Sequence, residues 1–377
     1  MEPAPTSERN ERWASTMHGH HSGGAVRLAH PDDVGLGEVV VFDRGAREQA
    51  EAAAFSPQAT RARGAGDRSR EEAPDQLRTC FERDRDRILH SPAFRRLAGK
   101  TQVFVFPDDH QRTRLTHALE VAQVATAVAT ACGLNVTLTE AIALGHDCGH
   151  GPGGHASEDA LSPYVPGGFD HAVWGADVVV APLNLCAETL DGIRNHSWSR
   201  PAPSTPEGAV VSWADRIAYS CHDLEDAVQA GIVTYDLLPP LVRERVGTSR
   251  SSQLRAFIRG MIDAAVTTGQ VGMTDDLATA LAELRGFNYE RVYLRPASVR
   301  QSEAVVRVLQ ALVEHYADRP NLLPGEHAVG IAGGSEEALE AAVGYVAGMT
   351  DRYACQQAIA HLGWDRADLP EGIDVLR

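Results

Sequence analysis

Lysine is almost absent from this chain of 377 residues, because only Lys100 among the 35 basic residues is lysine, a skew that we attribute to compositional bias. Positive charge as a whole is also scarce, since the formal net charge is −16. A general nucleic-acid binder needs a basic face that displaces counterions from phosphates, so the charge argues against this class. A small anionic substrate stays open, because a pocket can be locally basic on an acidic protein.

Paired cysteines and long apolar runs are missing as well. The six cysteines are scattered without a CxxC pair, which is neither a disulfide framework nor a zinc-finger spacing. No apolar run approaches the roughly 18 residues that a membrane span requires, and no signal peptide opens the chain. We therefore expect a soluble cytoplasmic protein without a membrane partner.

Residues 1–75 are rich in Ala, Gly, Arg, Glu and Ser and have weak periodicity, so we expect a variable, partly disordered arm. Only residues 34–43, VGLGEVVVFD, have the apolar content to pack. The cluster HGHH contains His18, His20 and His21, which have a metal-binding composition. In a flexible arm an incidental His-rich patch is the better interpretation.

Helical patterns follow one another from about residue 76, and TQVFVF (101–106) is the one sign of a strand. Residues 115–131 form one such pattern, in which a single helix stripe carries His117, Val121, Val124 and Val128. More helices are expected over residues 210–230 and beyond the proline pair at 239–240. The predicted fold class is all-α.

The helix expected over residues 137–147 begins with Thr137 and Glu140 in capping-box spacing. Its apolar stripe ends in Gly145 and His146, so a histidine again shares the face that should be buried. Burying an ionisable group is costly unless it is paired or bound to a metal. For one histidine alone, a hydrogen bond to a carbonyl is the ordinary interpretation.

Two such histidines, with further carboxylates, favour a metal site. Asp147 follows His146 directly, and a third helix supplies Asp215. Two imidazoles and two carboxylates suit a divalent hydrolytic metal and leave open positions for water and phosphate.

Asp215 has an alternative role, because Ser212-x-x-Asp215 also has capping-box spacing. At about 100° per residue, a polar sector of the same helix lies within about 80° of Asp215, and it comprises Tyr219, His222, Asp223 and Asp226. This sector favours a site, although a solvent-facing surface would be polar too.

The stretch GHDCGHGPGGH (145–155) has the glycine density of a phosphate-cradling loop. Such loops follow a strand and open a helix, whereas these glycines follow a helix, and neither GK[ST] nor GxGxxG is present. We interpret the stretch as a helix end and a turn that brings His150 and His155 over the site as acid–base groups. Glu158 lies three residues after His155, a spacing at which its carboxylate can hydrogen-bond the imidazole and hold its tautomer. The alternative is that His150 and His155 are surface loop histidines without a catalytic role.

The order His117, His146-Asp147, Asp215 resembles the H…HD…D signature of the HD-domain metal phosphohydrolases. The flanking segments narrow the likeness to the deoxynucleoside triphosphate triphosphohydrolases, or dGTPase-like proteins. The likeness extends from about residue 61 to 357 through RTCFERDRDRILHSPAFRRLAGKTQVFVF, RTRLTHALEVAQVA, LTEAIALGHDCGH, GGFDH, LNLCAETLDGI, ADRIAYSCHDLEDAVQAGI and VAGMTDRYA. It implies an HD-domain helical fold with additional C-terminal helices: an arm over 1–75, an HD core over 76–240 and a helical region over 241–377 packed on the core.

The resemblance also implies roles for the acid–base and metal-binding groups. It makes His155 the catalytic histidine near the leaving 5′ oxygen, with Glu158 supporting it and His150 near the α-phosphate. The metal would be Mn, Mg or another transition metal such as Fe, Co, Ni or Zn. Its implied ligands are His117, His146, Asp147 and Asp215.

For the substrate, the resemblance implies that Arg114 binds phosphate, and that Gln102 and Asp223 hold the deoxyribose 3′-hydroxyl. Tyr219 would pack against the sugar, where a 2′-hydroxyl would be crowded, so the site would prefer deoxynucleotides. Further basic candidates for neutralising the phosphate tail are Lys100 and Arg216.

The chain departs from the family at three positions near this loop. The family reads close to HDLGHTPFGHAGE, whereas this chain reads HDCGHGPGGHASE. Cys148 stands for a leucine, Gly153 for a phenylalanine, and Ala172 for the asparagine after the GGFDH histidine. Because the ligands survive, we expect hydrolysis, with a looser loop and a changed base preference or rate.

The expected protein is a metal-dependent triphosphohydrolase that converts a dNTP, such as dGTP, and water to deoxynucleoside and inorganic triphosphate, and the family implies a homo-oligomer. Two alternatives stay open. One is an HD phosphohydrolase acting on another nucleotide phosphoester, and the sugar-contact matches argue against it. The other is a catalytically weak nucleotide-binding protein, which the Gly153 departure motivates.

Overall fold

The computed structural model describes residues 7–21, 25–32, 34–325 and 330–371. The chain divides into two compact units, Met1–Phe42 and Asp43–Arg377. The first contains α1 (Glu8–Ser15) and an antiparallel pair of short strands, β1 (His20–His21) and β2 (Arg27–Leu28). None of its described residues is buried, and the apolar side chains of residues 34–42 are exposed, so their ability to pack stays a prediction. The histidines of HGHH join no group of metal-ligating side chains among the described residues.

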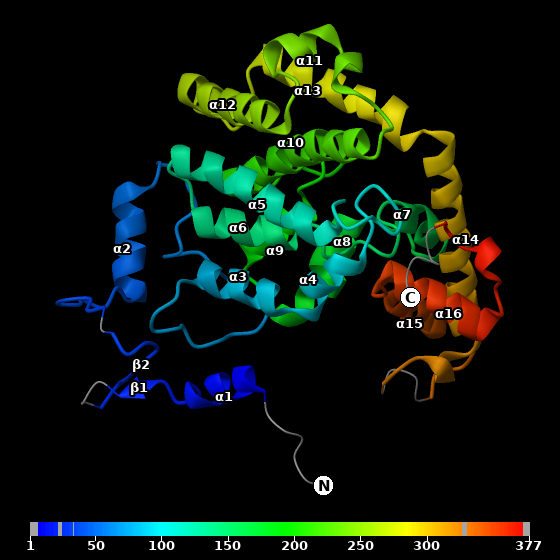
Figure 1. Ribbon diagram of the computed structural model, residues 1–377, viewed down its shortest axis with the longest axis horizontal. Coiled ribbons are helices and arrows are strands. Elements are labelled where there is room, and N and C mark those ends of the chain that lie inside the picture. Colours follow the sequence, from blue (N-terminus) through cyan, green and yellow to red (C-terminus); the bar gives the residue numbers. More distant parts are fainter. Residues whose placement is uncertain (1–6, 22–24, 33, 326–329, 372–377) are drawn as a thin grey trace. The chain divides into compact units, whose positions relative to one another are not determined.

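The second unit is helical, which confirms the predicted all-α class (Figure 1). Among its described residues the only strand-like pairings are the isolated bridges Arg68–Cys186 and Thr101–Thr113, so residues 101–106 form a loop rather than a strand. Its helices are α2 (Arg44–Ala54), α3 (Cys80–His90), α4 (Pro92–Arg96), α5 (Arg114–Ala131), α6 (Val136–Gly145), α7 (Ala156–Leu161), α8 (His171–Trp174), α9 (Ala187–Arg194), α10 (Pro206–Gln229), α11 (Pro240–Arg245), α12 (Arg250–Thr268), α13 (Asp275–Asn288), the π-helical turn η6 (Tyr289–Tyr293), α14 (Pro296–Asp318), α15 (Glu336–Ala347) and α16 (Asp351–Leu362).

The centre of this unit is made by α5, α6 and α10, which pack on one another, with α3 and α9 against α6 and α12 and α13 against α10 (Figure 1). The apolar stripe of α5 is buried as expected, since Val121, Val124 and Val128 are all at most 2% exposed. Each such valine contributes about 1.5–3 kcal/mol of burial energy. A second apolar cluster joins α7 to α14, α15 and α16.

Two predicted helix starts are wrong. α6 begins one residue before Thr137, and Asn135 is its N-cap, because the Asn135 side chain accepts a hydrogen bond from the backbone N–H of Leu138 at 3.1 Å. α10 begins at Pro206, capped by Thr205, so Asp215 lies well inside the helix. The capping-box alternative for Asp215 is therefore excluded.

Part of the segment that we expect to be a loose arm belongs to the second unit. α2 lies within residues 43–75, and Ala59 and Ala62 are buried in the main apolar cluster. Thr60 is anchored as well, since its backbone N–H donates to the Glu207 carboxylate at 3.0 Å. The division of the chain at residues 75 and 240 stays a prediction.

Candidate metal centre and catalytic cavity

The four predicted metal ligands lie together where three central helices meet. α5 presents His117, the end of α6 presents His146 and Asp147, and α10 presents Asp215. The Nε2 atom of His117 lies 3.0 Å from Oδ1 of Asp215, and Nε2 of His146 lies 3.4 Å from Asp147 Oδ1 and 3.6 Å from Asp215 Oδ1. All are buried except Asp215, whose side chain is 20% exposed.

The hydrogen bonds of His146 engage Nδ1 and leave Nε2 directed at the position that a cation would occupy. His146 Nδ1 lies 2.6 Å from the carbonyl oxygen of Ala143, which can only accept, so Nδ1 carries the proton. Its Nε2 is buried without a hydrogen-bond partner among the described residues and faces the carboxylates. Burial disfavours the imidazolium, yet Asp147 and Asp215 outweigh it and raise the pKa of His146 to about 9, so a cation that binds Nε2 displaces a proton. The negative potential and the donor set of nitrogen and oxygen atoms fit a divalent metal ion.

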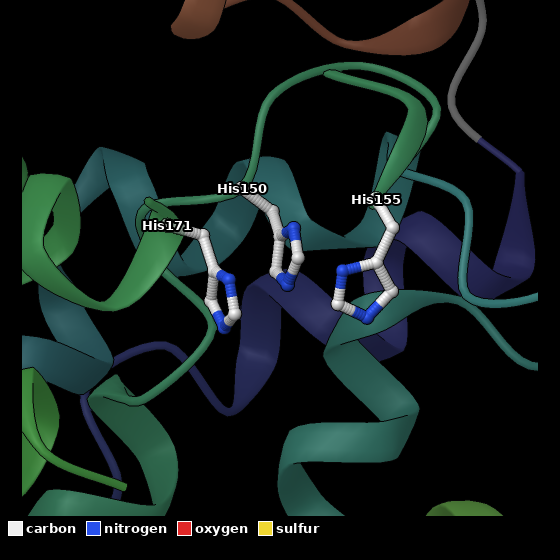
Figure 2. A group of neighbouring side chains, drawn as sticks. All are labelled: His150, His155 and His171. Carbon is white, nitrogen blue, oxygen red and sulfur yellow. The ribbon is translucent and has the colours of Figure 1, made fainter. Parts of the chain in front are cut away.

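Beside this centre lies a row of three further histidines (Figure 2). The rings of His150 and His171 are stacked with centroids 3.7 Å apart, and the His155 ring meets His150 edge-on at 4.9 Å. His150 is buried and its Nε2 lies 3.2 Å from Asp147 Oδ1, whereas His155 is exposed. Burial, Arg114 and His171 hold the pKa of His150 well below its usual range, which favours the neutral ring.

The expected contact between His155 and Glu158 is present. The Glu158 carboxylate accepts from His155 Nδ1 at 2.9 Å and also from the backbone N–H and Nδ1 of His171, at 3.1 and 2.6 Å. Burial opposes ionisation, but these two histidines hold the pKa of Glu158 far below its usual range. One carboxylate therefore orients two imidazoles on the same side of the site.

His171 and His196 were not predicted as site residues. Nδ1 of His196 donates to the Ile193 carbonyl oxygen at 2.8 Å, and the Nε2 atoms of the two histidines are 3.2 Å apart. Burial and neighbouring histidines lower the pKa of His196 to about 4, which favours its neutral ring. The GGFDH motif was the signal for His171, and nothing singled out His196.

A cavity of about 750 Å³ opens over both groups of histidines. On its walls the candidate sugar contacts Gln102 and Asp223 each have a buried oxygen, Oε1 and Oδ1, without a hydrogen-bond partner among the described residues. Tyr219 also lines it and accepts from Arg285 Nε at 2.8 Å. Burial raises the pKa of Asp223 to about 7, although the Tyr293 hydroxyl donates to its Oδ2 at 2.5 Å.

The three basic candidates differ in their positions. Arg114 lines the cavity, and its guanidinium donates to Asp147 Oδ2 at 2.8 Å. Arg216 also lines it, with its guanidinium carbon 3.5 Å from the centre of the Trp198 ring, a cation–π contact. Lys100 lies elsewhere.

Lys100 is a correction to the predicted substrate contacts. Its side chain is buried, and its ammonium donates to the carbonyl oxygens of His150 and Ala347. Burial and the nearby Arg96 lower its pKa to about 8. The ammonium therefore joins the histidine loop to the end of α15, and Lys100 does not line the cavity.

Gly153 is anchored through its backbone. Its backbone has φ = +74°, a conformation that favours glycine, and its N–H donates to Asp351 Oδ1 at 2.8 Å. A β-carbon here would lie 2.4 Å from Cγ1 of Val305, so that valine fills the space. Ala172 is fully buried in the first turn of α8, and Cys148 is buried in the core.

The helices and their His and Asp groups define an HD-domain phosphohydrolase, a class of metal-dependent hydrolases. Residues 114–220 match the HD domain, and residues 271–359 match the phosphohydrolase-associated domain. No helix among the described residues has the length and apolarity needed to cross a membrane.

Named relatives narrow the class further. The chain is 42% identical to a deoxyguanosinetriphosphate triphosphohydrolase-like protein of Caldanaerobacter subterraneus subsp. tengcongensis, over 81% of this chain and 92% of that protein. It is 40% identical to a protein of the same description from Clostridium perfringens (strain 13 / Type A), over 77% of this chain and 89% of that protein. The chain thus belongs to the deoxyguanosinetriphosphate triphosphohydrolase-like family of HD-domain proteins.

Proposed function

We propose that the protein is a metal-dependent dNTP triphosphohydrolase that releases deoxynucleoside and inorganic triphosphate. The observation that carries the proposal is that one cavity brings together a cluster of nitrogen and oxygen ligands, a histidine row and two buried oxygens without a hydrogen-bond partner among the described residues. The names of its relatives support the substrate class.

The metal ligands in this proposal are His117, His146, Asp147 and Asp215. A divalent ion held there would supply a Lewis acid and lower the pKa of a coordinated water. The ligands come from three helices that pack on one another, so the core holds their relative positions. Arg114, already turned toward Asp147, would bind a phosphate oxygen of the substrate.

His155 is the proton donor in this proposal. Hydrolysis at the α-phosphorus forms a P–O bond to water and breaks the bond to the 5′ oxygen, which must take up a proton as it leaves. His155 lines the cavity, and Glu158 holds its Nδ1, which leaves Nε2 for the leaving oxygen. His150 is the buried neighbour that lies between His155 and His171 (Figure 2) and would contact the α-phosphate.

The sugar would lie between Gln102, Asp223 and Tyr219. A 3′-hydroxyl can donate a hydrogen bond to the unpartnered oxygen of Gln102 or Asp223, which removes the cost of leaving it buried and unpaired. The ring of Tyr219 would crowd a 2′-hydroxyl, which favours deoxynucleotides over ribonucleotides. Arg216, held on Trp198, would neutralise the outer phosphates.

The test is a product analysis. Purified protein with each of several divalent metals, Mn²⁺ first, is incubated with every dNTP and rNTP, and products are separated by chromatography. We expect deoxynucleoside and triphosphate in equal amounts. Release of dNDP or dNMP would contradict attack at the α-phosphorus, and activity on ribonucleotides alone would indicate another phosphohydrolase. A nucleotide that raises Tm while no product forms would indicate a binding protein.

A further inference from the structure

One wall of the cavity carries the side-chain amide of Gln301, whose NH2 and carbonyl groups both make hydrogen bonds. The N-terminal half of α14 turns one face to the cavity, through Ala297, Ser298, Gln301 and Ser302. Nε2 of Gln301 donates to the main-chain carbonyl of Glu371 at 3.2 Å, and the N–H of Glu371 donates to Gln301 Oε1 at 2.9 Å. Glu371 itself lines the cavity.

This pair of bonds has the pattern by which an amide side chain recognises a nucleobase. An N–H donor beside a C=O acceptor is found along the edge of guanine or thymine, and the reversed order is found on adenine and cytosine. Glutamine reads such edges with both groups at once, because its carboxamide can turn to present either order. Apolar Val105, Leu294 and Ala297 line the same cavity and offer surface for the flat face of a base.

We propose that Gln301 is the base-reading residue of this cavity, and that the main chain of Glu371 competes with the base for it. The proposal rests on the nucleotide substrate proposed above. Because the cavity is continuous from His117 to Gln301, a nucleotide with its phosphates at the metal centre directs its base toward other walls, of which α14 is one. Glu371 must leave Gln301 before the base can bind there, so its contact lowers the affinity for substrate.

The first test measures binding, independent of turnover. Affinity for each dNTP is measured by equilibrium dialysis in EDTA, with inorganic tripolyphosphate as the ligand that lacks a base. Gln301→Met keeps the length of the side chain and removes both hydrogen-bonding groups. We expect dNTP binding about 10-fold weaker or more, with a changed order among the four bases, and unchanged binding of tripolyphosphate.

The matched control is Gln123→Met, the same substitution at an exposed glutamine of α5 outside the cavity. It should leave both ligands unaffected. If Gln301→Met binds every dNTP as the wild type does, or loses tripolyphosphate and dNTP equally, the base-reading role is wrong.

The second test removes the competitor. A chain that ends at Pro370 lacks the Glu371 main chain, and a control chain that ends at Gly372 keeps it. Because the two bonds are exposed and neutral, we expect the shorter chain to bind dNTPs about 2- to 10-fold more tightly, with no change for tripolyphosphate. Equal affinities would overturn the competition.

The outcomes separate this inference from the proposed reaction. Protein that binds dNTPs through Gln301 but releases no triphosphate would leave the base-reading role standing and end the proposed reaction. If wild type and Gln301→Met release triphosphate with equal efficiency, the proposed reaction stands and the base-reading role is wrong.

Discussion

Asp147 is the residue on which the charges of the site converge. Its carboxylate contacts the Arg114 guanidinium at 2.8 Å, His150 Nε2 at 3.2 Å and His146 Nε2 at 3.4 Å. Burial opposes its charge, but Arg114 and the histidines hold the pKa of Asp147 well below its usual range, so it stays ionised. It is therefore the counter-charge of its neighbours, and in the proposed function it is also a metal ligand.

We predict that Asp147→Asn lowers kcat at least about 100-fold, because substitutions one shell outside a metal already cost 10–100-fold. The control is Asp177→Asn, which removes an exposed carboxylate paired with Arg194. Circular dichroism of both variants checks that they are folded. If the folded Asp147→Asn variant keeps the kcat of the wild type, Asp147 is not a metal ligand.

Asp223 makes the free energy of unfolding of the protein depend on pH. Its folded pKa of about 7 lies above the ordinary value of 3.8, chiefly because of burial. Between these values the native state holds a proton that the unfolded chain has lost, so the free energy of unfolding falls as pH rises through this window. The penalty is complete above pH 7 and absent below the unfolded pKa.

Asp223→Asn imitates the protonated side chain and keeps an oxygen for the Tyr293 hydroxyl. We predict that the variant is more stable than the wild type at pH 8, by on the order of a few kcal/mol. The difference should shrink to nothing toward pH 4. Urea unfolding of both proteins across this range measures it. A difference that stays constant with pH would show that Asp223 is already ionised without cost.

At the scale of elements, Asp351, the first residue of α16, links this helix to Thr101 and to the histidine loop at Gly153. The Asp351 carboxylate accepts from the Thr101 backbone N–H at 2.9 Å, the Thr101 hydroxyl at 2.6 Å and the Gly153 N–H at 2.8 Å. Thr101 in turn accepts from Arg114 Nε at 3.0 Å. Asp351 is thus one of the links between the C-terminal helices and the residues around Arg114.

We predict that Asp351→Ala destabilises the protein by about 2–5 kcal/mol, because it leaves three buried donors without an acceptor. Turnover should fall as well, since Thr101 and Gly153 flank Arg114 and the histidine turn. Glu336→Ala, in the first turn of α15 and exposed, is the matched control. If Asp351→Ala and Glu336→Ala have the same free energy of unfolding in urea, the hydrogen bonds of Asp351 do not stabilise the fold.

The elements also show what the sequence could predict. Histidines on apolar helix stripes identified His117 and His146, because burial of an imidazole needs a partner. His196 was missed because its approach to His171 depends on how the residues after α9 pack against the start of α8, which leaves no local pattern. Lys100 was misassigned because composition shows that a cation is present but not whether it faces a cavity or a backbone carbonyl.

For the whole molecule, the two compact units are unequal in their contribution to the core. All buried residues of the described chain belong to Asp43–Arg377. We therefore predict that a chain beginning at Asp43 keeps the Tm and kcat of the full chain. Thermal unfolding and the product assay on both chains check this, and a clearly lower Tm would show that Met1–Phe42 stabilises the fold.

Metal binding should also raise the stability of the whole second unit, because the proposed ligands come from α5, α10 and the end of α6 at the centre of the fold. An ion that binds only the folded protein stabilises it by RT ln(1 + [M]/Kd), about 2.7 kcal/mol at 100 times Kd. We predict that Mn²⁺ raises the Tm of the wild type and that EDTA reverses the shift. Asp215→Asn should lose the shift, since Asp215 supplies an oxygen 3.0 Å from His117. Asp263→Asn, at an exposed carboxylate of α12, should keep it. An equal shift in all three proteins would place the bound metal elsewhere and would remove the central helices as its site.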